Sequence, residues 1–184
     1  MNLLLDRLPK EHNGIKINTD FRVFILFELL MQDNELSDKE KAITAFELFF
    51  DKDVDVEKGL ECILWFYRCG KEEKKSNKKT SGKKQKQIYS YEFDDEYIFS
   101  AFLQQYNINL NSIKYLHWWE FKALLQGLND DTQFVKIMSY RAIDLGKIKD
   151  KEEKKRYKEL QELYALPDMR TMEQKEADFG RAFW

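Results

Sequence analysis

The sequence predicts an all-α fold, a multi-helix orthogonal bundle with a small extended arm or hairpin at its N-terminus and a disordered basic insertion. The 184-residue chain contains only two prolines and seven glycines, fewer than a turn-rich β protein uses. Apolar residues recur at helical spacing through most of the chain. Aromatic residues make up 15% of it, and its length allows one domain with a substantial core.

Residues 115–128 are apolar around most of a helical circumference, so we expect them to form the central helix. A helix of this kind is buried on more than one side. Each large side chain that it buries contributes about 1.5–3 kcal/mol. One face at helical spacing holds Trp118, Phe121, Leu125 and Leu128, and a second holds Leu116, Trp119 and Ala123.

The first 18 residues are expected to form the small hairpin or extended arm. The turn-forming pair Asn13-Gly14 precedes a short alternating run. Thr19 or Asp20 can then cap a helix that runs to about Gln32. The residues expected to face inward from this helix are Phe21, Phe24, Ile25, Phe27 and Leu29.

Two more helices complete an N-terminal half, residues 19–69. Ser37 and Glu40 match a capping box, in which the serine oxygen accepts a backbone N–H and the glutamate reaches back. Asp53 or Asp55 starts the next helix, which runs to about Cys69. Expected inward residues are Ala42, Ile43, Phe46, Phe49 and Phe50, and then Val56, Leu60, Ile63, Leu64 and Phe66.

Residues 70–87 differ from the rest because they contain no hydrophobic residue. Their eight lysines and two glutamates give a charge of +6, and the whole chain carries -2, so the remainder carries -8. Such a segment cannot repay the entropy of ordering, and we expect a disordered or weakly helical linker. The alternative is a nucleic-acid contact, although no arginine or aromatic residue accompanies the lysines. Its candidate residues are Lys74, Lys75, Lys78, Lys79, Lys83 and Lys84.

The C-terminal half, residues 88–166, opens with an alternating run, Ile88–Phe93, that predicts a short extended segment. Asp94 can cap a helix to about Tyr106. After the central helix, another helix reaches about Leu145, where Gly146 can end it. Expected inward residues are Tyr97, Ile98, Ala101, Phe102 and Gln105, and then Phe134, Ile137, Met138 and Ile143, while Arg141 is expected to pair with an acidic neighbour at the core edge.

The last helix of this half is strongly charged. Asp150 and Glu153 match a second capping box, and Pro167 ends the helix at about Leu166. Its narrow apolar stripe predicts packing on one side only. Residues 167–184 are expected to form a short terminal helix or a tail. The stripe consists of Tyr157, Leu160, Leu163 and Tyr164.

The sequence offers little that could form a reaction centre. His117 and Glu120, three apart on a helix, are half of a metal-carboxylate arrangement. They leave a metal-dependent enzyme open as an alternative hypothesis. We expect instead a structural or partner-contacting histidine. Phosphate-binding, nucleophile-elbow and zinc-ligand motifs are lacking. We therefore expect no catalytic residue, metal or cofactor, and we expect Cys62 and Cys69 to be free thiols, about 10 Å apart on one helix face.

Four segments resemble the bacteriophage gene-product-fifteen family over residues 19 to about 166. HWW-x-F is the most specific motif, and neither the basic insertion nor the terminal FGRAFW matches. Genes of this family lie between the major tail protein and the tape measure gene in tailed phages and prophages of Gram-positive bacteria. The four segments are TDFR (Thr19–Arg22), YIFSAFLQQYNINL (Tyr97–Leu110), YLHWWEFKALLQGL (Tyr115–Leu128) and IMSYRAIDL (Ile137–Leu145).

This resemblance implies a tail assembly chaperone that binds the tape measure protein and other tail proteins. Such a protein would present apolar helix faces to its client and would form homo-oligomers along it. Localisation in the host bacterial cytoplasm follows, with no membrane or nucleic-acid partner. The runner-up function is a nucleic-acid-associated phage protein acting through residues 71–86. Expected partner-binding residues are Trp118, Trp119, Phe121, Phe179, Phe183 and Trp184.

Overall fold

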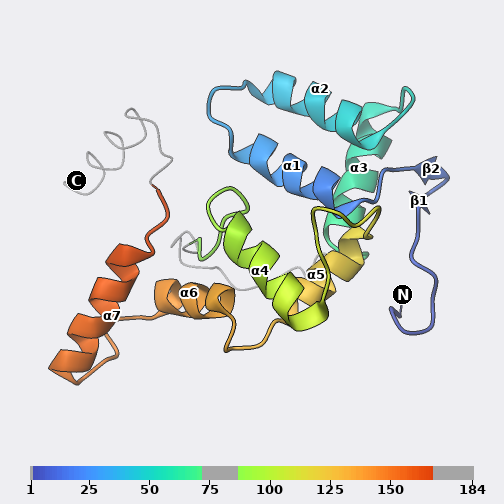
Figure 1. Ribbon diagram of the computed structural model, residues 1–184. Coiled ribbons are helices and arrows are strands. Elements are labelled where there is room, and N and C mark those ends of the chain that lie inside the picture. The colour runs from blue at the N-terminus through green and yellow to red at the C-terminus, as the bar shows by residue number, and fades with distance from the viewer. Residues whose placement is uncertain (1, 72–86, 168–184) are drawn as a thin grey trace.

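The computed structural model describes residues 2–71 and 87–167, and within these ranges it confirms an all-α fold (Figure 1). Seven helices and one two-stranded hairpin make up this part of the chain. The expected basic linker lies almost wholly outside the described residues, as does the expected terminal helix or tail. The elements are β1 (Glu11–His12), β2 (Ile15–Lys16), α1 (Phe21–Gln32), α2 (Asp38–Phe49), α3 (Val56–Tyr67), α4 (Asp95–Tyr106), α5 (Trp118–Gln126), α6 (Gln133–Ala142) and α7 (Lys151–Leu163).

The N-terminal hairpin forms where the sequence predicted it. β1 and β2 pair antiparallel, with Glu11 opposite Lys16. The two turn residues, Asn13 and Gly14, have φ values of 50° and 78°. A two-residue turn of this kind needs positive φ at both positions, which asparagine and glycine tolerate best. His12 stacks on Trp65 with ring centroids 4.2 Å apart, so the hairpin is attached to α3.

Local capping signals fix the starts of the first three helices. The Asp20 side chain accepts the backbone N–H of Arg22 at the start of α1. Ser37 and Glu40 form both halves of the predicted capping box on α2. Asp55 accepts the N–H of Lys58 at the start of α3. These caps satisfy backbone donors that have no partner within the helix.

Helix α5 is shorter than the predicted helix over residues 115–128. Residues before Trp118 are extended because they pair with the chain that enters α1, and Asp20 and His117 form an isolated antiparallel bridge. The backbone N–H of Trp118 donates to the Thr19 carbonyl at 2.9 Å, and that of Phe21 donates to Leu116 at 3.0 Å. A contact with a distant segment thus replaces the first predicted turn.

The C-terminal half departs from the predicted boundaries at three places. The run Ile88–Phe93 forms no strand and ends in a turn. Helix α6 ends at Ala142, before the predicted stop at Gly146, and α7 ends at Leu163 instead of about Leu166. The Gln161 side chain on α7 donates to the carbonyls of Tyr140 and Ile143, both at 2.8 Å. These bonds satisfy carbonyls at the end of α6, so the helix needs no glycine stop.

Helical periodicity predicted most inward positions, with errors on α2, α3 and α5 and at Leu163 of α7, which is 71% exposed. Ala42, Ile43, Val56 and Leu60 are exposed, and so is Ala123, whereas Ala45 and Cys62 are buried. Helix α2 packs mainly on α1 along one side, so its remaining apolar positions face solvent. Cys62 and Cys69 are free thiols, and burial raises the pKa of Cys62 to about 11.

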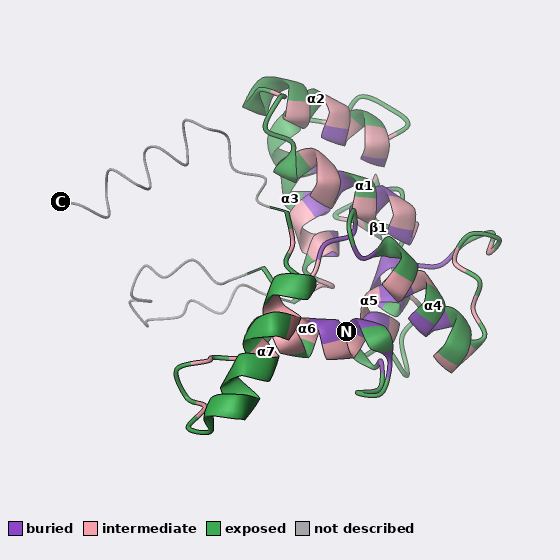
Figure 2. Cartoon of the chain, turned by 60° about the vertical axis from the view of Figure 1, so that its left-hand side comes forward, coloured by how far each residue is buried: buried purple, intermediate pink, exposed green. Residues whose placement is uncertain are grey.

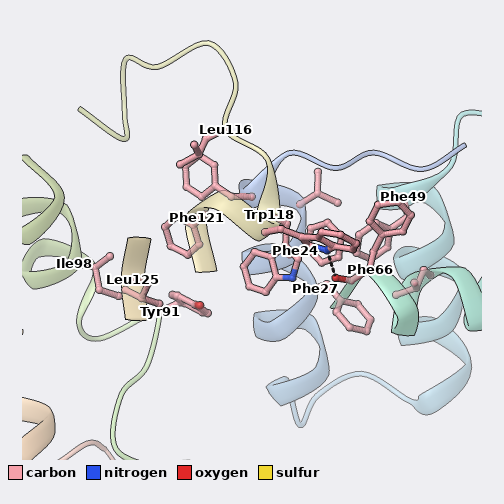
Figure 3. Close-up of a cluster of buried hydrophobic side chains, with 14 of the residues drawn as sticks. Phe24, Phe27, Phe49, Phe66, Tyr91, Ile98, Leu116, Trp118, Phe121 and Leu125 are labelled. Atoms are coloured by element: carbon pink, nitrogen blue, oxygen red, sulfur yellow. Dashed lines mark hydrogen bonds between the residues drawn. The ribbon is translucent and has the colours of Figure 1, made fainter. Parts of the chain in front are cut away.

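One connected group of buried side chains joins residues from α1 through α6. Its centre is aromatic: the rings of Phe24 and Trp118 stack at 4.9 Å, and those of Phe21 and Phe121 stack at 4.8 Å. Figure 3 shows Trp118 beside Phe24 within this cluster. Helix α7 buries no residue and lies beyond α6 at one end of the molecule (Figures 1 and 2).

Candidate functional site

The TDFR and HWW segments, which carried the resemblance, meet each other in the fold. The hydroxyls of Thr19 and Tyr115 share a hydrogen bond of 2.7 Å. The Arg22 guanidinium pairs with Asp20 at 3.2 Å and donates to two carbonyls of the loop over residues 110–113, at 2.9 and 2.7 Å. The polar groups of this motif therefore hold α1 against the segment that leads into α5.

His117 is a structural histidine in this arrangement. It is buried and caps α5, where its Nδ1 accepts the backbone N–H of Trp119 at 3.0 Å. Its Nε2 must then carry the proton and donate to the Pro9 carbonyl at 2.9 Å. Burial lowers the pKa of the imidazole below its ordinary value. The Glu120 carboxylate accepts the backbone N–H of His117, and no group of three metal-ligating side chains gathers within the described ranges.

The predicted partner-binding residues of α5 lie in the interior. Trp118 and Phe121 are fully buried, and Trp119 is 2% exposed. The indole N–H of Trp118 donates to Tyr67 at 3.2 Å, and that of Trp119 donates to Phe66 at 2.8 Å. Both acceptors are carbonyls at the end of α3, and the Phe66 carbonyl also accepts the backbone N–H of Cys69 at 3.0 Å. Trp118 and Trp119 therefore pack in the core of the fold, and Phe121 is buried behind a surface cavity described below.

The other candidates named from the sequence fall outside the part of the chain that the structure describes. They are the terminal residues Phe179, Phe183 and Trp184, and the lysines Lys74, Lys75, Lys78, Lys79, Lys83 and Lys84.

Asp94 and Arg141 form the principal buried ion pair. Arg141 Nη1 and Nη2 lie 2.6 and 2.9 Å from the two carboxylate oxygens of Asp94. Arg141 Nε also donates to the Tyr164 carbonyl at 2.6 Å, and the Ser90 backbone N–H donates to Asp94 at 2.9 Å. The expected acidic neighbour of Arg141 is thereby confirmed. This network joins α4, α6 and the end of α7, and its polar groups are occupied by one another.

Two cavities that are open to solvent lie along α1. A cavity of about 480 Å³ lies between α1, α4 and the loop at residues 110–111, with Phe21, Ile25 and Phe99 among its walls. A second cavity of about 750 Å³ lies farther along α1, where Leu26, Leu29 and Leu30 face Thr44 and Leu48 of α2. We call these two cavities the α1 hollows. Leu26 is 49% exposed, so the apolar wall is open to solvent.

Carboxylates surround the α1 hollows. Asp95 and Glu96 line the first, and Asp33, Glu35 and Glu92 line the second; all five residues are exposed. The single cation among the lining residues is Arg22, whose guanidinium is already held by Asp20 and two carbonyls. An apolar floor with an acidic border can bind an apolar helix or side chain.

A further cavity of about 790 Å³ lies beside the hairpin and is less selective. Its lining mixes lysines with aspartates, including Lys16, Lys58, Asp51 and Asp55. Because lysines and aspartates are present in similar numbers, the cavity has no preference for a positively or a negatively charged ligand. We therefore take the α1 hollows as the candidate site.

Sequence reasoning missed the α1 hollows although a signal was present. Residues 21–31 are apolar at nearly every position, which is more than one buried face requires. The structure buries Phe21, Val23, Phe24 and Phe27 and leaves Leu26 at the surface. The same all-round apolar pattern was assigned only to the α5 region.

Comparison with models of protein families matches residues 4–166 to the family described as Bacteriophage Gp15 protein. Neither the curated proteins nor the solved structures gave a match. Among the described helices, none is sufficiently long and apolar to cross a membrane.

Proposed function

Because the chain belongs to the Bacteriophage Gp15 protein family, we propose that it acts in phage tail assembly, as a chaperone that binds the tape measure protein in the host cytoplasm. The observation that supports this proposal is the pair of apolar α1 hollows. They offer solvent-accessible binding surface, whereas the described polar networks join one part of the fold to another. One aromatic residue of α5, Phe121, lines the first hollow.

The dimensions of α1 suit a helical client. Its 12 residues span about 18 Å at 1.5 Å per residue, so a client helix of three turns can lie along it. Each large apolar side chain that the client buries contributes about 1.5–3 kcal/mol before the cost of association is subtracted. Two or three such anchors contribute about 3–9 kcal/mol, which is of the same order as the cost of association, so we expect a weak and reversible complex.

A co-expression pull-down with the tape measure protein of the same tail gene cluster tests the proposal. Leu26→Asp places a charge in the apolar wall, and Leu60→Asp is the matched control because both leucines are 49% exposed. We expect the wild type and Leu60→Asp to retain the tape measure protein and Leu26→Asp to lose it. Equal retention by all three forms would contradict the assignment of the α1 hollows, and no retention by any would contradict the chaperone function.

Self-association along the client is part of the proposed function. Sedimentation of the purified chain, alone and with the tape measure protein, tests it. We expect larger assemblies in the presence of the client, and a single chain per client molecule would contradict this part of the proposal.

A further inference from the structure

The border of the α1 hollows has one sign of charge. Within the described residues, Asp33, Glu35, Glu92, Asp95 and Glu96 form no ion pair with a lysine, arginine or histidine. Arg22 does not offset them, because its guanidinium is neutralised by Asp20 and directed to backbone carbonyls. The free charge presented around the apolar floor is therefore negative.

We propose that the segment bound in the α1 hollows is an amphipathic helix whose apolar face is bordered by lysines or arginines. This inference rests on the proposed function and adds the charge pattern of the client. A leucine-rich face would contact Ile25, Leu26 and Leu29, and its basic borders would lie beside Glu92, Asp95 and Glu96.

The carboxylates select the bound helix by its charge. Exposed ion pairs are individually weak, but several charges of one sign around a low-dielectric wall act together on an approaching ligand. They favour a basic helix and disfavour an acidic helix of equal hydrophobicity. The same field repels phosphate groups, so it favours a protein helix over a nucleic acid.

Two designed peptides separate the charge from the apolar contact. Each is a fluorescein-labelled helix of about 18 residues with the same leucine face, and its borders are lysine in one and glutamate in the other. Binding to the full-length protein is measured by fluorescence anisotropy at about 0.05 M and about 0.5 M salt. We expect the lysine-bordered peptide to bind at least about tenfold more tightly at low salt, with the difference shrinking at high salt.

Charge neutralisation locates the effect on the protein. The variant Glu92→Gln, Asp95→Asn, Glu96→Gln should lose most of the preference. The control variant Glu57→Gln, Glu152→Gln, Glu153→Gln should keep it, since it removes equal charge from exposed first-turn positions of α3 and α7. Equal loss in both variants would overturn the proposal by showing an effect of net charge alone.

The remaining outcomes are also decisive. Equal binding of both peptides, abolished by Leu26→Asp, would overturn the charge inference and leave apolar client binding intact. Binding of neither peptide would overturn the inference, while the pull-down separately decides the proposed function.

A dimer that Leu26→Asp dissociates would identify a second copy as the occupant. A gain in peptide affinity on changing Phe183→Ala with Trp184→Ala would identify this chain's own terminus. Either occupant would overturn the proposal.

Discussion

The carboxylate of Asp94 and the guanidinium of Arg141 form a two-pronged ion pair, with side chains 0% and 7% exposed. Asp94 precedes α4, yet its side chain makes no capping bond there because both carboxylate oxygens accept from Arg141. A helix-capping signal in the sequence therefore serves a contact 47 residues away.

Breaking this pair from one side should be costly. Asp94→Asn leaves the Arg141 charge buried, and Arg141→Met leaves the Asp94 charge buried. We expect each change to lower the free energy of unfolding by about 3–5 kcal/mol. Urea unfolding measures both, and the double variant should lose less than the two single losses added together. Strict additivity would show that the two groups do not stabilise each other.

Glu28 gives a prediction about pH. Burial raises the pKa of its carboxyl above the ordinary 4.5, although Lys122 and the hydrogen bond from Tyr67 oppose the shift. A raised pKa means that the folded state binds the proton more tightly. Protonation of Glu28 therefore stabilises the folded state. This contribution to the free energy of unfolding is complete below pH 4.5 and is lost as the pH rises through the folded-state pKa.

Glu28→Gln removes this titration and keeps an oxygen that can accept from Tyr67. At pH 7 the variant should melt a few degrees higher than the wild type, because no charge has to be buried. The difference should vanish below about pH 4.5, where the wild-type carboxyl is neutral. Thermal melts at several pH values between about 4 and 7, on both sides of the ordinary carboxyl pKa, measure this difference in melting temperature. A variant less stable than the wild type at pH 7 would contradict the account.

For His117 we expect the opposite pH dependence of the folding stability. Burial lowers its pKa below 6.5, so the stability from the neutral ring is present above pH 6.5 and falls as the pH drops through the folded-state value. His117→Asn can still cap α5 but does not titrate and does not reach Pro9. We expect it to cost about 1 kcal/mol at neutral pH and to flatten the loss of stability below pH 6.5. An unchanged acid dependence would assign that loss to another group.

Trp119→Phe tests the bond between α5 and the end of α3. The phenyl ring fills most of the space, but the Phe66 carbonyl loses one of its two donors, the indole N–H at 2.8 Å. Because the carbonyl keeps its bond from the Cys69 backbone N–H, the expected cost is that of one lost hydrogen bond, about 0.5–1.5 kcal/mol. Chemical denaturation measures the loss, and Trp65→Phe is the control, because Trp65 is only partly buried. Equal losses would mean that ring volume, and not the indole N–H, decides the stability.

The sequence predicted what depends on neighbours along the chain. Caps at Asp20, Ser37 and Asp55 satisfy backbone donors two or three residues away, so the local pattern determined them. The predicted helical turn at residues 115–117 failed because its residues pair with Thr19 and Phe21, nearly a hundred residues earlier. Local periodicity contains no information about such a partner.

The candidate site could not be predicted for the same reason. Whether Leu26 faces a neighbour or solvent depends on where α2 and α4 pack, and helical spacing alone does not place them. The α5 tryptophans show the same limit, because an aromatic cluster that stabilises a core has the same sequence pattern as one that contacts a partner. The burial of Trp118 and Trp119 and their bonds to the end of α3 place both side chains in the core.

Site-specific photocrosslinking shows directly whether the surface of α1 contacts the tape measure protein. A photoreactive phenylalanine analogue replaces Leu26 in one full-length form and the equally exposed Leu60 in another, each co-expressed with the tape measure protein and irradiated. We expect a covalent adduct with the tape measure protein from position 26 and little or none from position 60. An adduct from position 60 with none from position 26, or no adduct from either, would contradict this expectation.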